Sequence, residues 1–212
     1  MEELTIALWR ARELDSAACH QVLLEGWSTI AQAVPGYQAL TINIADIDQG
    51  MFRDGPDALI VLSLKSAHGL DDVPDRDVLH RIASRYEVWR TLSNEVLRDP
   101  TPGLGIKMVS LVHRGEQISH AQFIRHWNEN HAPLALRHHV GMCGYMQREV
   151  RKAYTPGGSA VDGVAELSFR TRRDFDERLY DSDAGKAIIW DDVPRFIERK
   201  RGTGSLMTAH LF

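Results

Sequence analysis

The segment Asp99-Pro100-Thr101-Pro102-Gly103-Leu104-Gly105 divides the chain of 212 residues into two halves of similar length. Two prolines and two glycines in seven positions are typical of a linker. On both sides of it the sequence predicts the same order of elements, strand–helix–strand–strand–helix–strand. We therefore divide the chain at this segment, into residues 1–100 and residues 101–212.

Apolar runs and turn residues place the elements of the first half. We expect its strands at residues 4–10, 37–45, 58–64 and 87–97. Its first helix is expected to begin at Asp15 or Ser16, either of which can cap it, and to bury Cys19, Leu23 and Trp27 on one face. A second helix is expected at about residues 76–86, with residues 87–97 as a continuation of that helix being the alternative.

The second half starts the same order again. We expect its strands at residues 107–113, from Gly144 onward, at 161–169 and at 202–212. Ser119 and Gln122 form a capping-box pattern that predicts the start of its first helix. Two further helical pieces are expected at residues 174–180 and 185–199, the second bent or split by Pro194.

The repeated order is that of a ferredoxin-like unit, an α+β fold with helices on one face of an antiparallel sheet. The other face of each sheet would be a large exposed apolar patch unless something covered it. Two sheets packed face to face cover each other. We therefore predict a single-chain version of a dimeric α/β barrel, built from two ferredoxin-like repeats.

Composition limits the classes of function. The hydrophobic fraction of 43% and the charged fraction of 25% are those of an ordinary globular protein. The net charge of −4 gives no basic surface for nucleic acid or an anionic membrane, and no apolar run is long enough to span a bilayer. Cys19 and Cys143 have no metal-type spacing and predict no disulfide framework. We expect a cytoplasmic protein that binds neither nucleic acid nor membrane.

One face of the helix after Ser119 carries the candidate chemistry. Phe123, Trp127 and His131 are spaced by four and four residues, so they share that face. Two aromatic rings followed by an imidazole predict an apolar pocket with one titratable group. We expect His131 to lie at the helix end, just before Pro133, where carbonyl dipoles favour the protonated ring and burial the neutral one. Such a ring suits proton transfer, although a histidine that only satisfies helix-end carbonyls is the open alternative.

Three blocks of the second half resemble the EthD family of the dimeric α/β-barrel superfamily, over about residues 107–212. They are Phe123-x-x-x-Trp127-x-x-x-His131-x-Pro133-Leu134, Gly144-Tyr145 with Gln147, and Asp162-Gly163-Val164-Ala165-Glu166-Leu167. The resemblance implies a ferredoxin-like fold that pairs sheet to sheet, usually between two chains. Relatives in the superfamily include cofactor-free polyketide cyclases, decarboxylases, lactone isomerases and haem-degrading monooxygenases. The family, named for a protein of ethyl tert-butyl ether degradation, therefore does not settle a reaction.

The first half lacks the candidate residues. If Trp27 is matched with Trp127, Ala31 stands at the place of His131. Gly36-Tyr37 follows the first helix as Gly144-Tyr145 follows its counterpart, and we take the two pairs as equivalent. We predict that the first half is a degenerate scaffold and that the chain has one active pocket, in the second half.

Several other side chains are candidates, each with a plainer alternative. The Tyr145 hydroxyl could donate to a substrate carbonyl or enolate, or it could simply pack a strand end. Glu166 lies within a strand, where a carboxylate needs a partner or a pocket, so it could orient His131 or pair elsewhere. His113 is a further candidate at the end of a strand. Phe123 and Trp127 would form pocket walls or core.

The histidines of this segment do not have metal-site spacing. They are His113, His120, His126, His131, His138 and His139. His126 and His131 are five residues apart and are expected to diverge on a helix, so we predict no metal site. His138 and His139 are expected on the exposed helix end.

These observations predict a cofactor-independent enzyme that transfers protons beside the carbonyl of a small apolar molecule. His131 and Tyr145 would be catalytic, and Phe123, Trp127, Glu166 and His113 would bind substrate. The reaction would be a cyclisation, dehydration, decarboxylation or isomerisation, in polyketide or in aromatic or ether catabolic metabolism. Two alternatives stay open: a haem-binding or haem-degrading monooxygenase, and a non-catalytic ligand-binding or accessory protein of an oxygenase. A homodimer is also compatible with the sequence.

Overall fold

The computed structural model describes residues 1–50, 52, 54–65, 76–155 and 161–212. Its eight strands form one closed antiparallel barrel in the order β1-β3-β2-β8-β5-β7-β6-β4. The strands are β1 Glu2–Arg10, β2 Tyr37–Ile44, β3 Ala58–Leu64, β4 Ala83–Leu97, β5 Ile106–Val112, β6 Met142–Ala153, β7 Gly163–Phe169 and β8 Thr203–Leu211.

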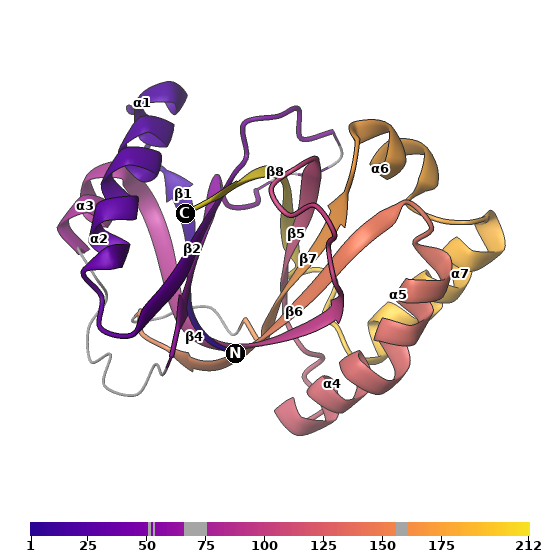
Figure 1. The fold of residues 1–212 in the computed structure, drawn as a ribbon. Helices are drawn as coiled ribbons and strands as arrows, with labels where there is room; N and C mark the ends of the chain where they lie inside the picture. The colour runs from indigo at the N-terminus through magenta and orange to yellow at the C-terminus, as the bar shows by residue number, and fades with distance from the viewer. Residues whose placement is uncertain (51, 53, 66–75, 156–160) are drawn as a thin grey trace.

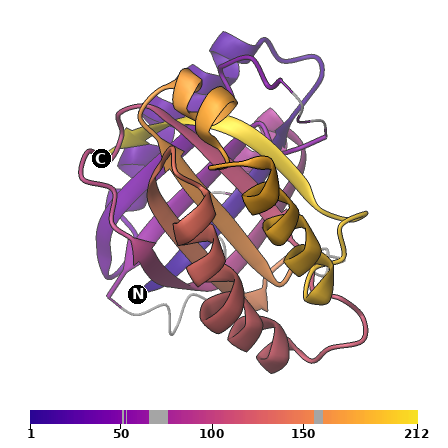
Figure 2. The same ribbon diagram turned by 90° about the vertical axis from the view of Figure 1, so that its right-hand side faces the viewer.

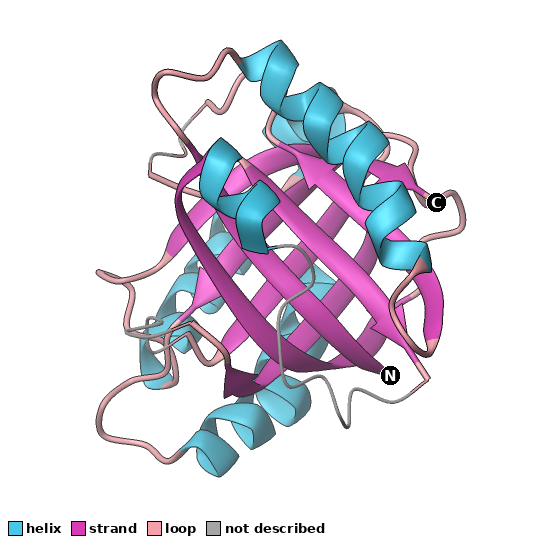
Figure 3. Ribbon diagram, turned by 90° about the vertical axis from the view of Figure 1, so that its left-hand side faces the viewer, coloured by secondary structure: helices cyan, strands magenta, loops and turns pink. Residues whose placement is uncertain are grey.

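Helices cover the barrel on two opposite sides (Figure 1). The helices of the first half are α1 Ser16–Gln21, the π-helical turn η1 Val22–Gly26, α2 Trp27–Gln32 and α3 Arg76–Ile82. Those of the second half are α4 His120–His126, the π-helical turn η2 Trp127–His131, α5 Ala132–His138, α6 Arg172–Arg178, α7 Asp183–Asp192 and the 3-10 turn η3 Val193–Arg195. Figure 2 looks onto the second group and Figure 3 onto the first.

The two predicted repeats are present, and their sheets also join at both edges. β1 to β4 make one four-stranded sheet and β5 to β8 the other. Hydrogen bonds between β2 and β8 close one seam, and bonds between β4 and β6 close the second. Every strand therefore has two neighbours, so the barrel leaves no open sheet edge.

Each sheet has one face toward its own helices and one face toward the barrel interior. Trp27 is buried between helix and sheet in the first half, and Phe123 and Phe169 are buried in the same layer of the second half. A third core inside the barrel includes Trp89 and Met207, from both halves. The tandem chain thus has four layers, helices–sheet–sheet–helices, with a core between each pair of neighbouring layers.

The barrel interior also holds a buried ionic network between the halves. Arg148 on β6 donates from Nε to Glu3 on β1 at 2.8 Å and from Nη1 to Glu166 on β7. The second Glu166 oxygen lies 2.9 Å from Nζ of Lys107 on β5. Arg148, Glu3 and Glu166 are at most 6% exposed. Two cations and two carboxylates therefore neutralise each other away from water.

Some element boundaries differ from the sequence prediction. α3 ends at Ile82, and β4 begins at Ala83, because β1 extends to Arg10 and offers ladder partners as far as Ala83. α7 ends at Asp192, with Pro194 in the following 3-10 turn, so this proline does split the predicted helix. Asp15 caps α1, and Ser119 with Gln122 forms the predicted capping box.

No helix in the described part of the chain is long and apolar enough to cross a membrane. Cys19 and Cys143 are both free thiols.

Candidate active site

A cavity of about 550 Å³ lies between the helices and the sheet of the second half. Its floor includes Met108, Ala165 and Leu167 from β5 and β7, and its walls include Trp127 and His131 from η2. This volume is within the usual range for small-molecule sites, and the lining is mostly apolar. The cavity is therefore large enough and suitably lined for a small apolar ligand.

His131 lines this cavity and is only 9% exposed. Its Nδ1 lies 2.9 Å from Oδ2 of Asp192, the last residue of α7. A carboxylate only accepts, so Nδ1 carries the proton and, in the neutral ring, Nε2 is the basic nitrogen. Among the described residues Nε2 has no hydrogen-bond partner. The ring is thus held at one nitrogen and available at the other.

Asp192 binds two histidines at once. Its other oxygen lies 2.8 Å from Nε2 of His126, and the Asp192 residue is 5% exposed. Burial by itself would raise the pKa of this carboxyl, but the hydrogen bonds from His131 and His126 hold that pKa below its ordinary value. Asp192 therefore stays ionised near neutral pH and fixes the orientation of His131.

The π-helical turn explains this convergence and corrects two expectations. The Ala132 N–H bonds to the Trp127 carbonyl five residues earlier, so the helix is wider here and His126 and His131 point the same way. The expectation that they diverge was wrong. His131 also does not end the helix, because α5 continues through Pro133 to His138. No helix-end dipole acts on its ring.

Tyr145 lies on β6 and lines the same cavity. Its hydroxyl oxygen accepts from Trp127 Nε1 at 2.9 Å and from Gln147 Nε2 at 3.0 Å. The Trp127 carbonyl also accepts from Gln147 Nε2, at 3.4 Å, which agrees with that amide orientation. With both acceptor positions used, the hydroxyl proton is left to donate. Burial raises the pKa of Tyr145 to about 12, so this proton stays in place.

Trp127 and Phe123 have different roles. Trp127 lines the cavity, as predicted for a wall. Phe123 is fully buried behind it, with ring centroids 5.3 Å from Trp127 and 5.8 Å from Phe196, and is not part of the lining. Its predicted contact with substrate is therefore replaced by a core role that supports Trp127.

Glu166 and His113 do not line the cavity. Glu166 has the partner that burial demands, but that partner is the Arg148–Lys107 pair inside the barrel, on the opposite face of the sheet. Its neighbours Ala165 and Leu167 face the cavity instead. Of the two alternatives for Glu166, pairing elsewhere is the one observed, and Asp192 is the residue that orients His131.

Asp192 was not among the candidates from the sequence, and the exposed position expected for His139 was wrong. His138 and His139 were expected to be exposed but are 8% and 6% exposed, because the segment after α6 covers them. His139 lines the cavity, and His138 pairs with Asp181. The described residues contain no cluster of three or more His, Cys, Asp or Glu side chains arranged to hold a metal ion.

Fold and site together define a dimeric α/β barrel whose two subunits are joined in one chain, with a single candidate pocket described in its second half. Residues 115–200, which contain the helices of that half and its strands β6 and β7, match the family model of the EthD domain. The predicted resemblance to the EthD family is therefore confirmed for this part of the second half.

Solved structures of very low identity share the fold across the whole chain. An anthrone oxidase-like protein superposes with a TM-score of 0.68 at 11% identity, covering 100% of this chain and 92% of its own. A mutant of chlorite dismutase from Candidatus Nitrospira defluvii gives a TM-score of 0.54 at 10% identity, covering 98% and 91%. None of the curated proteins matches this chain in sequence. These likenesses establish the fold. Any function has to be argued from the residues of the site.

Proposed function

We propose that the second half is an enzyme that transfers a proton beside the carbonyl of a small, largely apolar molecule without a cofactor. The observation that carries the proposal is the pair of His131 and Asp192, in which Asp192 holds Nδ1 of a histidine that lines a mostly apolar cavity. Cyclisation, dehydration, decarboxylation and isomerisation all contain such a proton transfer. The EthD domain and the enzyme names of the structural neighbours support a small-molecule enzyme or an oxygenase-related protein.

Each group has a role in the proposed step. Nε2 of His131 takes a proton from the carbon next to the carbonyl, so the C–H bond breaks and an N–H bond forms. The electron pair moves onto the carbonyl oxygen, which accepts the hydrogen bond of the Tyr145 hydroxyl. Asp192 stabilises the imidazolium that results, and the mostly apolar lining strengthens these interactions by limiting water. Return of the proton to the same or another atom completes the step.

The test is the exchange of carbon-bound hydrogen for deuterium, which needs no knowledge of the natural product. The probes are 2-tetralone and phenylacetone in D₂O, followed by proton NMR, with the rate without protein subtracted. We expect enzyme-dependent exchange of the protons beside the carbonyl. His131→Gln should lower its rate about 10²- to 10⁴-fold, the usual contribution of a general base.

Two controls separate the chemistry from the fold. His210→Gln changes a histidine that does not line the cavity, and its exchange rate should equal that of the wild type. Circular dichroism should show that His131→Gln is folded. Equal exchange in His131→Gln and wild type, or no enzyme-dependent exchange of either ketone, would overturn the proposal.

The two alternative functions make different predictions. A haem protein would use the same Nε2 of His131 as an iron ligand, with Asp192 as its hydrogen-bonded partner. Addition of hemin would then give a Soret band that His131→Gln lacks. A non-catalytic accessory protein would show neither the band nor the exchange. The cavity volume favours a protein that binds a small molecule over one that only binds a protein partner.

A further inference from the structure

His139 is a second imidazole on the wall of the same cavity. It follows α5 and is 6% exposed. Its Nδ1 lies 2.6 Å from the Leu179 carbonyl, which can only accept, so Nδ1 carries the proton. Nε2 then has a lone pair, and no hydrogen bond to it occurs among the described residues. The proposed proton transfer by His131 and Tyr145 does not involve this nitrogen.

The surroundings hold the His139 ring in this state. The Tyr180 ring packs against it with centroids 5.1 Å apart. Burial lowers the pKa of His139 below its ordinary value, and the neighbouring His131 and His138 act in the same direction. The ring is therefore neutral at pH 7, and its Nε2 is an acceptor only.

We infer that Nε2 of His139 accepts a hydrogen bond from a hydroxyl group of the ligand and so determines specificity. This inference rests on the proposed function, in that it takes the cavity as the substrate site, and it narrows the class of substrate. Tyr145 supplies a donor for a carbonyl, and His139 supplies an acceptor for a hydroxyl. The ligand class is then an apolar ketone that also carries an enol or phenol group.

An acceptor in an apolar wall discriminates between a hydroxyl and its methyl ether. The hydroxyl donates to this nitrogen, whereas the ether has no proton and leaves the nitrogen without a donor. Both compounds can accept from Tyr145, so that contact does not separate them. A hydrogen bond of this kind corresponds to roughly a 3- to 10-fold difference in affinity.

The probes are 2-naphthol and 2-methoxynaphthalene, with dissociation constants from titration calorimetry at pH 7. The wild type should bind 2-naphthol roughly 3- to 10-fold more tightly. His139→Phe keeps a ring but removes the acceptor, and the ratio should fall to about one. His138→Phe alters the adjacent buried imidazole, which does not line the cavity, and should keep the wild-type ratio.

A second measurement does not depend on a folded variant. In ¹⁵N-labelled wild-type protein the unprotonated Nε2 of His139 should shift upfield on addition of 2-naphthol and not on addition of the ether. Equal affinities of the two probes for the wild type, an unchanged ratio in His139→Phe, or no selective ¹⁵N shift would overturn the inference. Loss of the hydroxyl preference with intact ketone exchange would remove the role of His139 alone, whereas lost exchange would remove the proposed function.

Discussion

The two halves of the barrel differ most on the sheet face that each turns toward its own helices. β3 and β7 are both seven residues long and both lie in the middle of their half, so their residues can be matched in order. At the third residue the second half has Ala165, flanked by Ser110 and Gln147. The first half has isoleucine at all three places, which are Ile6, Ile42 and Ile60.

At the fifth residue of the same strands the contrast is between a phenol and an aliphatic chain. Tyr145 lies opposite Leu167, and Leu40 lies opposite Leu62. Leu40 therefore matches Tyr145. The equivalence of Tyr37 and Tyr145 expected from the sequence was wrong, because Tyr37 pairs with Leu64, two residues further along β3.

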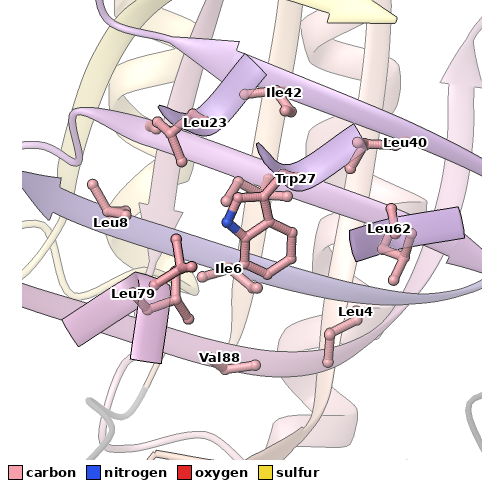
Figure 4. Close-up of a cluster of buried hydrophobic side chains, with 14 of the residues drawn as sticks. Leu4, Ile6, Leu8, Leu23, Trp27, Leu40, Ile42, Leu62, Leu79 and Val88 are labelled. Atoms are coloured by element: carbon pink, nitrogen blue, oxygen red, sulfur yellow. The ribbon is translucent and has the colours of Figure 1, made fainter. Parts of the chain in front are cut away.

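The two matched tryptophans show the result of these changes. In Figure 4 aliphatic side chains surround Trp27, and its Nε1 has no hydrogen-bond partner among the residues that the structure describes. Nε1 of Trp127 donates to Tyr145, and a cavity lies beside the ring. The same fold therefore contains a pocket in the half where small and polar residues stand in place of isoleucine and leucine beside the matched tryptophan.

We expect the largest loss of stability from a substitution inside the barrel, where the two halves also differ in the side chains that they contribute. Arg148 lies opposite the second residue of β7, and its counterpart in the first half is Asn43. Arg148→Met would leave Glu3 without its partner and Glu166 with Lys107 alone. We expect a loss of about 3–5 kcal/mol in the free energy of unfolding, measured by urea denaturation.

The matched control for this variant is Asn43→Ala. Asn43 donates to the Leu59 carbonyl, and its Oδ1 has no hydrogen-bond partner in the described part of the chain, so the expected loss is about 1 kcal/mol. Equal losses in the two variants would show that the ionic network does not stabilise the union of the halves.

Stability at low pH should depend on the same ionic network. Burial alone would raise the pKa of Glu166, but Arg148 and Lys107 hold it below its ordinary value. A carboxyl with a lowered folded-state pKa stabilises the fold above its ordinary pKa, and that stability is lost as the pH falls through the lowered value. Arg148→Met removes one of the two cations, so its acid unfolding should begin at a higher pH than that of the wild type.

Substitutions at the third residue of β3 and β7 would test directly whether side-chain size there decides which half has a cavity. Ala165→Ile with Ser110→Ile gives the second half the isoleucines of the first at two of the three places and fills the cavity. We expect 2-naphthol to bind at least about 10-fold more weakly, since the ligand and the new side chains occupy the same space. Ile60→Ala in the first half should cost about 2–5 kcal/mol, because it opens a void in a filled core.

Undiminished binding by the double variant would place the ligand outside the cavity. A loss below 1 kcal/mol in Ile60→Ala would show that the first half is not tightly filled.

The sequence predicted the architecture because the signals for it are local. The linker, the Ser119–Gln122 capping box and the apolar runs each act within a few residues, and together they give the repeat. The position of His131 on a cavity wall also followed from local spacing, since Trp127 and His131 stay on one face despite the π-helical turn.

The partners of the site could not be predicted from local signals. Asp192 is 61 residues from His131 in the chain, and only the packing of α7 against α5 brings them together. The face of the sheet toward which Glu166 points could not be predicted either. All seven residues of β7 are buried, and no alternation of polar and apolar residues distinguishes its two faces.

The smallest expected effect compares the two tryptophans themselves. Trp127→Phe and Trp27→Phe each remove similar ring volume from a buried site, so the packing losses should be alike. Trp127→Phe also removes a donor from the Tyr145 oxygen, whereas Trp27→Phe removes an N–H that had no partner. The loss in the free energy of unfolding should therefore be about 1 kcal/mol greater for Trp127→Phe, the usual worth of one buried hydrogen bond. Urea denaturation of both variants in parallel measures the difference, and equal losses would mean that the Trp127–Tyr145 bond serves the ligand site without stabilising the fold.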